Sequence, residues 1–142
     1  MRSYFLDTGF LIALEAADDS QHQTAVSHWQ EITRMSPLPR LITTSFILSE
    51  VATFFNSRGR HAKAVEIGER LLNSSSVRLL FIEEETVHKA WHYFVRHEDK
   101  TYSLADCVSF VVMEDLGLRE ALAFDRHFAQ AGFARTPLGE KG

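Results

Sequence analysis

The stretch YFLDTGFLIAL, residues 4–14, contains two apolar runs separated by a single carboxylate, Asp7. The first run is short and aromatic, which is typical of a buried strand. The Asp-Thr-Gly segment indicates a strand end, a tight turn and a helix start. Asp7 is therefore expected where a strand meets a helix, and open α/β sheets bind ligands at the carboxyl ends of their strands. Because a charge among apolar side chains is costly, Asp7 needs a partner elsewhere in the chain.

The pattern of a strand followed by a helix continues outward from this stretch. Strands are expected over about residues 2–6, 41–44, 77–82, 121–124 and 133–138, and helices over about 8–17, 21–35, 46–57, 61–72, 85–97, 104–116 and 126–130. Ser45 and Ser103 can cap the helices that follow them. The alternation predicts one α/β domain with a central parallel sheet and helices on both faces. We place this domain over residues 1–138 and expect a disordered tail over 139–142.

Composition limits the function classes. The 142 residues are enough for one domain with its own core, and the net charge of −4 argues against binding nucleic acid by bulk positive charge. A nuclease that uses metal ions remains open, because bound cations reverse the local sign. The single cysteine, Cys107, excludes an internal disulfide and favours a cytoplasmic location. No apolar run approaches the roughly 20 residues of a membrane span, so no membrane partner is expected.

Three further carboxylates are candidates for the site of Asp7. Asp125 also follows an apolar strand, although a turn or helix cap is the common alternative. Asp106 lies on a helix that is apolar on two sides, and a first-turn aspartate favoured by the helix dipole is its alternative. Glu50 lies on the polar side of its helix, so periodicity predicts an exposed side chain; only its position six residues after Thr44 places it near a strand end.

Such carboxylates need a cation if they converge. Two like charges about 4 Å apart repel by roughly 4 kcal/mol at an effective dielectric constant near 20. Magnesium is the natural cation, since it prefers oxygen ligands and accepts a few carboxylates plus water. A pair of such ions can clamp a phosphodiester and activate water.

Four motifs, taken in order, resemble those of the PIN domain, and more narrowly the VapC-type ribonuclease toxins of bacterial type II toxin–antitoxin pairs. The motifs are Asp7-Thr8 after the first strand, Ser-Glu-Val-Ala at residues 49–52, Ser-Leu-Ala-Asp-Cys-Val-Ser-Phe at 103–110 and Ala-Phe-Asp-Arg-His-Phe at 123–128. The resemblance covers about residues 3–134. No single motif is specific to this family, but the four motifs in this order and at this spacing are.

The resemblance implies a Rossmann-like sheet, an Mg²⁺ or Mn²⁺ site and cleavage of structured RNA such as tRNA or rRNA. It places the catalytic and metal-binding acids at Asp7, Glu50, Asp106 and Asp125. It also assigns Thr8 a hydrogen bond to a metal-bound water, whereas Gly9 stands where related toxins often carry a hydroxyl or amide. Such toxins form homodimers and are blocked by a cognate antitoxin protein.

Several assignments stay open at this stage. Asp99 is a candidate outer-shell ligand, and Lys100 and Arg126 are candidates for contacts with RNA phosphates, with a solvated surface as the alternative. The seven histidines show no spacing that favours a zinc site. A phosphatase of the haloacid dehalogenase type is disfavoured, because it needs an acid where Gly9 stands. A housekeeping RNA-processing nuclease and a non-cleaving RNA-binding or protein-binding domain remain alternatives to a toxin.

Overall fold

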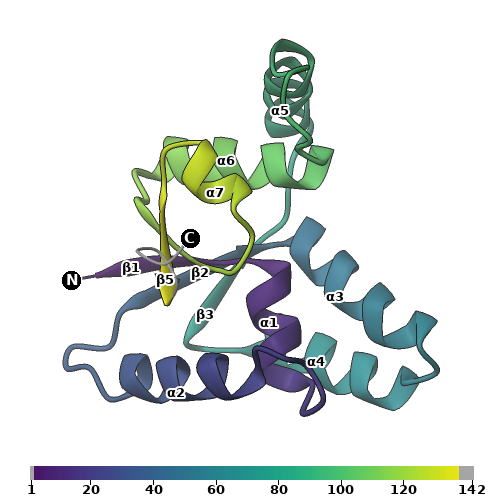
Figure 1. Cartoon of the computed structure of the whole chain (residues 1–142), viewed down its shortest axis with the longest axis vertical. Helices are drawn as coiled ribbons and strands as arrows, with labels where there is room; N and C mark the ends of the chain where they lie inside the picture. Colours follow the sequence, from purple (N-terminus) through teal and green to yellow (C-terminus); the bar gives the residue numbers. More distant parts are fainter. Residues whose placement is uncertain (1, 138–142) are drawn as a thin grey trace.

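The computed structural model describes residues 2–137, which form a single α/β domain with one parallel sheet (Figure 1). The strands are β1 (Ser3–Leu6), β2 (Arg40–Thr44), β3 (Val77–Leu80), β4 (Glu120–Ala123) and β5 (Ala134–Pro137). The helices are α1 (Thr8–Glu15), α2 (His22–Thr33), α3 (Ser45–Ser57), α4 (His61–Asn73), α5 (Glu84–Arg96), α6 (Leu104–Leu116) and α7 (His127–Gln130). The expected tail over residues 139–142, and the domain boundary at 138, lie outside the described residues.

The sheet has the order β3-β2-β1-β4-β5, and all of its neighbouring strands are parallel. Strand β1 is central: Phe5 is paired with Ile42 of β2 on one side and with Ala121 of β4 on the other. The backbone N–H of Asp7 donates to the Leu122 carbonyl at 3.1 Å, so the contact between β1 and β4 continues to the end of the strand. The strand order reverses between β1 and β4, and that point is where open α/β sheets form their binding crevice.

Helices cover both faces of the sheet, as the sequence predicted. Figure 1 shows α1, α2 and α4 on one side and α6 and α7 on the other, with α5 projecting beyond α6. Among the helices of residues 2–137, none has both the length and the apolar character that crossing a bilayer requires.

An aromatic cluster ties β1 to the helices on one face. Phe5, Phe110 and Phe128 are fully buried, and the Phe128 ring lies 5.2 Å from that of Phe110 and 6.3 Å from that of Phe5. Burying a phenylalanine side chain contributes about 1.5–3 kcal/mol. Since Phe110 lies on α6 and Phe128 on α7, this packing holds both helices against the face of the sheet at β1.

The helix caps follow one expectation and depart from another. Ser103 caps α6 as expected. For α3, the Thr44 hydroxyl accepts the cap hydrogen bond from the Ile47 N–H, and Ser45 is the first helical residue. The Ser45 hydroxyl instead accepts from the Ile82 N–H at 3.0 Å and so fixes the chain that leaves β3.

Candidate active site

Asp7 occupies the cap position between β1 and α1, with extended backbone angles, and its side chain is only 7% exposed. Burial raises the pKa of this carboxyl to about 8, although the adjacent Thr8 backbone N–H acts in the opposite direction. The charges of Asp106, Asp125 and Glu50 are smaller causes of the same rise. The four carboxylates singled out in the sequence therefore lie close enough to influence one another electrostatically.

Asp106 begins the buried helix α6, where it forms a capping box with Ser103. The Ser103 hydroxyl accepts from the Asp106 N–H at 2.9 Å, and Asp106 Oδ2 accepts from the Ser103 N–H at 3.0 Å. Residues 107–113 of the same helix are all buried. The first-turn cap, considered above as an alternative to a functional role, is therefore present, but it occupies only one carboxylate oxygen.

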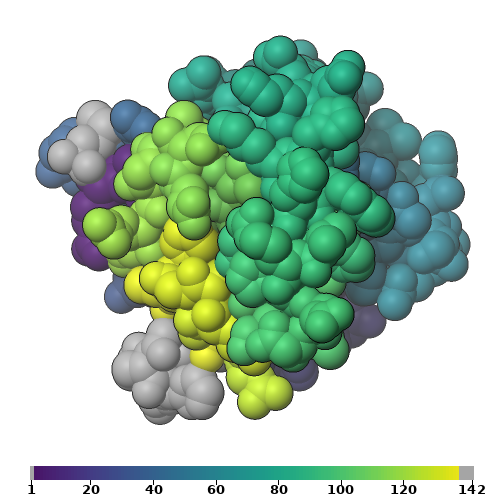
Figure 2. All heavy atoms as spheres, turned by 90° about the horizontal axis from the view of Figure 1, so that it is seen from above, coloured from purple at the N-terminus to yellow at the C-terminus, as the bar shows by residue number. Residues whose placement is uncertain are grey.

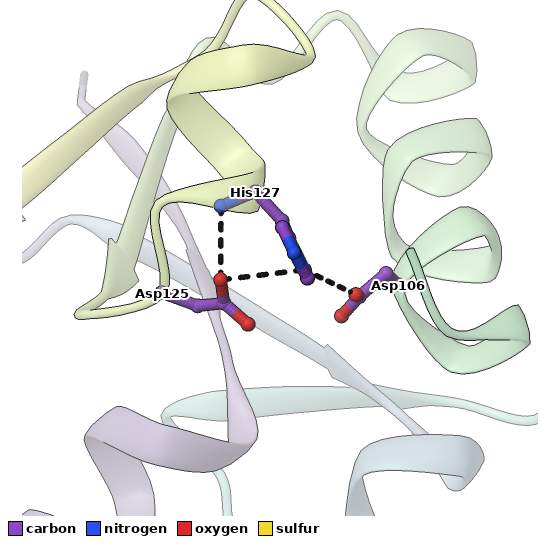
Figure 3. A group of neighbouring side chains, drawn as sticks. All are labelled: Asp106, Asp125 and His127. Carbon is purple, nitrogen blue, oxygen red and sulfur yellow. Dashed lines mark hydrogen bonds and ion pairs between the residues drawn. The ribbon is translucent and has the colours of Figure 1, made fainter. Parts of the chain in front are cut away.

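Asp125 and Asp106 are bridged by a histidine, as Figure 3 shows. His127 Nδ1 lies 2.8 Å from Asp106 Oδ2 and 3.3 Å from Asp125 Oδ1. The backbone N–H of His127 also donates to Asp125 Oδ1 at 2.9 Å. The ligand atoms of these three residues lie within 4.8 Å of one another, which is compact enough for one cation.

Glu50 is exposed, as helical periodicity predicted, yet it is linked to the site through α1. The Thr8 hydroxyl donates to Glu50 Oε1 at 2.6 Å, which joins the first turn of α1 to α3. The hydroxyl that the resemblance assigns to a metal-bound water thus bonds a carboxylate in this structure.

The remaining candidates are not drawn into the cluster. Asp99 lies in the loop before α6, where its Oδ2 is 3.6 Å from Lys100 Nζ; the described hydrogen bonds and ion pairs link neither residue to the four acids. Arg126 is exposed at the start of α7, next to Asp125. The outer-shell role of Asp99, and the phosphate contacts of Lys100 and Arg126, stay predictions.

The sequence did not indicate the roles of two residues that shape this region. His127 lies in the motif at residues 123–128, but histidine spacing gives no sign of its contacts with the two acids; the useful signal is an Asp-x-His segment directly after a strand. Arg135 is buried on β5 and donates from Nη1 to the Phe124 carbonyl at 2.7 Å, which fixes the chain just before Asp125. A basic residue in a short edge strand carries no sequence signal for such a role.

The donor set fits a hard divalent cation. Carboxylate oxygens on a sheet edge are the ligands that Mg²⁺ and Mn²⁺ accept, and burial makes an unpaired Asp7 anion costly unless a cation is near. A cavity of about 980 Å³ lies elsewhere; apolar and polar residues of α1, α2, α4 and the segment that follows α4 line it, and none of the four carboxylates does. The site is defined by converging charge and not by a deep pocket.

The topology and the acids at the β1–β4 crevice define a class of protein, and comparison with known families agrees. The PIN domain model matches residues 4–134, so the chain belongs to the PIN domain family. This confirms the resemblance found in the four motifs.

The chain is 37% identical over 132 residues to the 23S rRNA-specific endonuclease VapC20 of Mycobacterium tuberculosis, covering 93% of this chain and 96% of that protein. The crystal structure of that VapC20, described as a sarcin-ricin loop cleaving toxin, matches with a TM-score of 0.84 at 36% identity, covering 93% of this chain and 97% of that one. FitAcB from Neisseria gonorrhoeae matches with a TM-score of 0.65 at 16% identity, covering 93% of this chain and 95% of that one, and supports the fold alone.

Proposed function

We propose that this protein is the ribonuclease toxin of a type II toxin–antitoxin pair and that it hydrolyses a phosphodiester bond of ribosomal RNA with the help of a divalent cation. The observation that carries the proposal is that Asp106, Asp125 and Glu50 lie close enough to the buried Asp7 to act on its carboxyl electrostatically; the pKa of Asp7 is raised to about 8, chiefly by burial and also by these three charges. Membership of the PIN domain family supports the same reaction class.

The four carboxylates would hold Mg²⁺ or Mn²⁺. When bound, the cation supplies an activated water and stabilises negative charge on the phosphate oxygens. Asp7 contributes its oxygens as an ionised carboxylate, a form that burial disfavours without a cation. Thr8 holds Glu50 against the first turn of α1, so that α1 and α3 present their acids together.

Ribosomal RNA is the substrate class best supported. The relative of 37% identity is a 23S rRNA-specific endonuclease, and the similarity spans 93% of this chain. Since the protein carries a net charge of −4, contacts with RNA phosphates must come from local cations. Lys100 and Arg126 are both exposed and close in sequence to site acids, which makes them the residues we assign to phosphate contacts.

Cleavage of purified ribosomes and of total bacterial RNA tests the proposal. The assay compares wild-type protein in Mg²⁺, wild-type protein in EDTA, and Asp7→Asn in Mg²⁺. We expect one discrete fragment pair from the large ribosomal RNA in the first reaction alone. Fragments of tRNA in place of rRNA would correct the substrate. An Asp7→Asn variant that cuts as fast as wild type would refute the site.

We further propose that the chain forms a homodimer and is blocked by a cognate antitoxin protein. Helix α5 supports the homodimer, because it lies on the face seen in Figure 2 and carries the exposed apolar side chains Trp91, Phe94 and Val95, while Phe81, in the segment before the helix, is 67% exposed. Apolar exposure of this kind often marks a protein interface. Light scattering should give twice the chain mass, and Trp91→Glu should give the monomer; a wild-type monomer at micromolar concentration would refute the dimer.

The cytoplasmic location expected from the single cysteine stays a prediction.

A further inference from the structure

His127 contacts both acids on its side of the crevice and has no role in the reaction described so far. Its Nδ1 faces Asp106 Oδ2 and Asp125 Oδ1 at 2.8 and 3.3 Å, and its Nε2 lies 3.1 Å from Thr101 Oγ1. The imidazole therefore has a polar partner at each of its two nitrogens.

The direction of these hydrogen bonds follows from the partners. Ionised carboxylates only accept, so Nδ1 must carry a hydrogen to make its short contact with Asp106. In the neutral ring Nε2 is then the acceptor, and the Thr101 hydroxyl donates to it. Thr101 thus favours the one neutral tautomer in which His127 can bind the carboxylates.

The ring is also held by packing. Tyr102 is buried and meets the imidazole edge to face, with ring centroids 5.3 Å apart and planes at 83°. The backbone N–H of His127 is fixed by Asp125 Oδ1, and only 20% of the His127 side chain is exposed. These contacts leave the ring little freedom to turn away from the two acids.

In each of the two carboxylates, one oxygen accepts hydrogen bonds and the other does not. Asp106 Oδ2 accepts from Ser103 and His127, and Asp125 Oδ1 accepts from the His127 backbone. The other oxygens, Asp106 Oδ1 and Asp125 Oδ2, take no part in the hydrogen bonds found among residues 2–137. Figure 3 shows both of these oxygens below the bridging contacts, on the side where α1 and α3 lie.

We propose that His127 is a positioning residue that turns one oxygen of Asp106 and one of Asp125 toward a shared cation, and that Thr101 sets the tautomer this requires. The proposal rests on the metal-dependent function proposed above. In this proposal His127 hydrogen-bonds the metal ligands and does not itself bind the metal. Hydrogen-bonded groups that orient metal ligands typically change metal affinity by about 10- to 100-fold when they are removed.

The test measures Mn²⁺ binding by electron paramagnetic resonance, with no RNA present. His127→Ala should weaken Mn²⁺ binding by about tenfold or more. His127→Asn places an amide N–H where Nδ1 stands and should restore affinity to within about threefold of wild type. His127→Gln places its amide near the Nε2 position and should bind as weakly as the alanine variant. Thr101→Val keeps the volume but removes the hydroxyl, and should give an intermediate loss.

His61→Ala is the matched control, because His61 is exposed and bonds Asn56 away from the cluster. It should bind Mn²⁺ as wild type does. Thermal denaturation separates loss of affinity from loss of fold, and the near-isosteric Thr101→Val keeps the test informative if His127→Ala does not fold.

Two results would overturn the proposal. One is unchanged Mn²⁺ affinity in folded His127→Ala. The other is a strong nitrogen coupling in pulsed spectra of the Mn²⁺-loaded wild type, because a directly bound imidazole would make His127 a ligand. If wild-type protein cuts no RNA but the order of affinities holds, the proposed function fails while the positioning role stands.

Discussion

Asp7→Asn should make the metal-free protein more stable while it removes cleavage. In EDTA at pH 7 the unfolded chain carries Asp7 as a carboxylate, with a pKa near 3.8, whereas the fold raises that pKa to about 8 and keeps the carboxyl protonated. Folding therefore takes up about one proton. Protonating Asp7 at pH 7 costs the difference between the pH and the unfolded pKa of 3.8, at about 1.4 kcal/mol per pH unit. The free energy of unfolding of the wild type is therefore lowered by at most ~4 kcal/mol.

Asparagine is neutral at every pH and has the shape of the protonated acid, so it avoids this penalty. We expect a gain of about 2 kcal/mol, since local relaxation and water reduce the penalty on a buried charge. For a chain of this length, that corresponds to a rise in melting temperature of about 4–8 °C. Urea denaturation followed by tryptophan fluorescence measures the free energy directly. Asp99→Asn is the control, because Asp99 is exposed, and it should change stability by less than about 0.5 kcal/mol.

The pH dependence of stability tests independently whether Asp7→Asn stabilises the metal-free protein. A folded pKa above the unfolded one means that the native state binds more protons between pH 3.8 and about 8, so wild-type stability falls as pH rises through that window. The advantage of Asp7→Asn should therefore shrink between pH 7 and pH 5 and level off above pH 8. A variant that is less stable than wild type in EDTA, or whose advantage does not depend on pH, would refute the reasoning.

Three further predictions test other contacts. Burial alone would raise the pKa of Glu15, but ion pairs with Arg70 and Lys63 outweigh burial and lower the pKa. Glu15→Gln should therefore cost about 1 kcal/mol in urea denaturation at pH 7, and this cost should disappear as pH falls below 4.5 and through the lower pKa of the folded state. Gly9→Ala should raise stability by about 0.5 kcal/mol, because the added carbon meets Asp7 only at ordinary contact distance. Gly117→Ala should instead cost about 1 kcal/mol, because Gly117 has a φ of +68°. Calorimetry on the two variants measures whether each is more or less stable than wild type. Thr8→Val should lower cleavage by about tenfold while leaving the melting temperature nearly unchanged, since the bond to Glu50 is on the surface; equal cleavage rates would show that this bond is dispensable.

The parts of the site that follow strand ends were predictable from local sequence. Asp7 and Asp125 each come after a short apolar run, and parallel strands place their carboxyl ends on one edge of the sheet. Asp106 was found because apolar residues surround its helix on two sides. For Asp7 and Asp125 the signal is a local apolar run combined with one rule of sheet topology, and for Asp106 it is the periodicity of its helix alone.

Contacts between distant helices were not predictable in this way. Periodicity describes Glu50 correctly as exposed, but its bond to Thr8 joins residues 42 positions apart. The bridge from His127 to Asp106 likewise depends on α7 meeting α6 through the aromatic cluster. Thr44 caps α3, whereas the Ser45 hydroxyl accepts from the backbone of the chain that leaves β3. Because that partner is 37 residues away, local sequence does not predict which of the two residues is the cap.

The same contacts explain why so acidic a site is compatible with a stable fold. Glu50 accepts from a hydroxyl, Asp106 from a backbone N–H and an imidazole, and Asp125 from a backbone N–H, so each of these acids has a fixed donor. Asp7 is the most buried of the four, and burial is the main cause that raises its pKa to about 8. Keeping Asp7 ionised without a partner therefore carries an electrostatic cost. A cation that ionises Asp7 removes this cost, so binding of the metal and stability of the fold must be coupled through this one side chain.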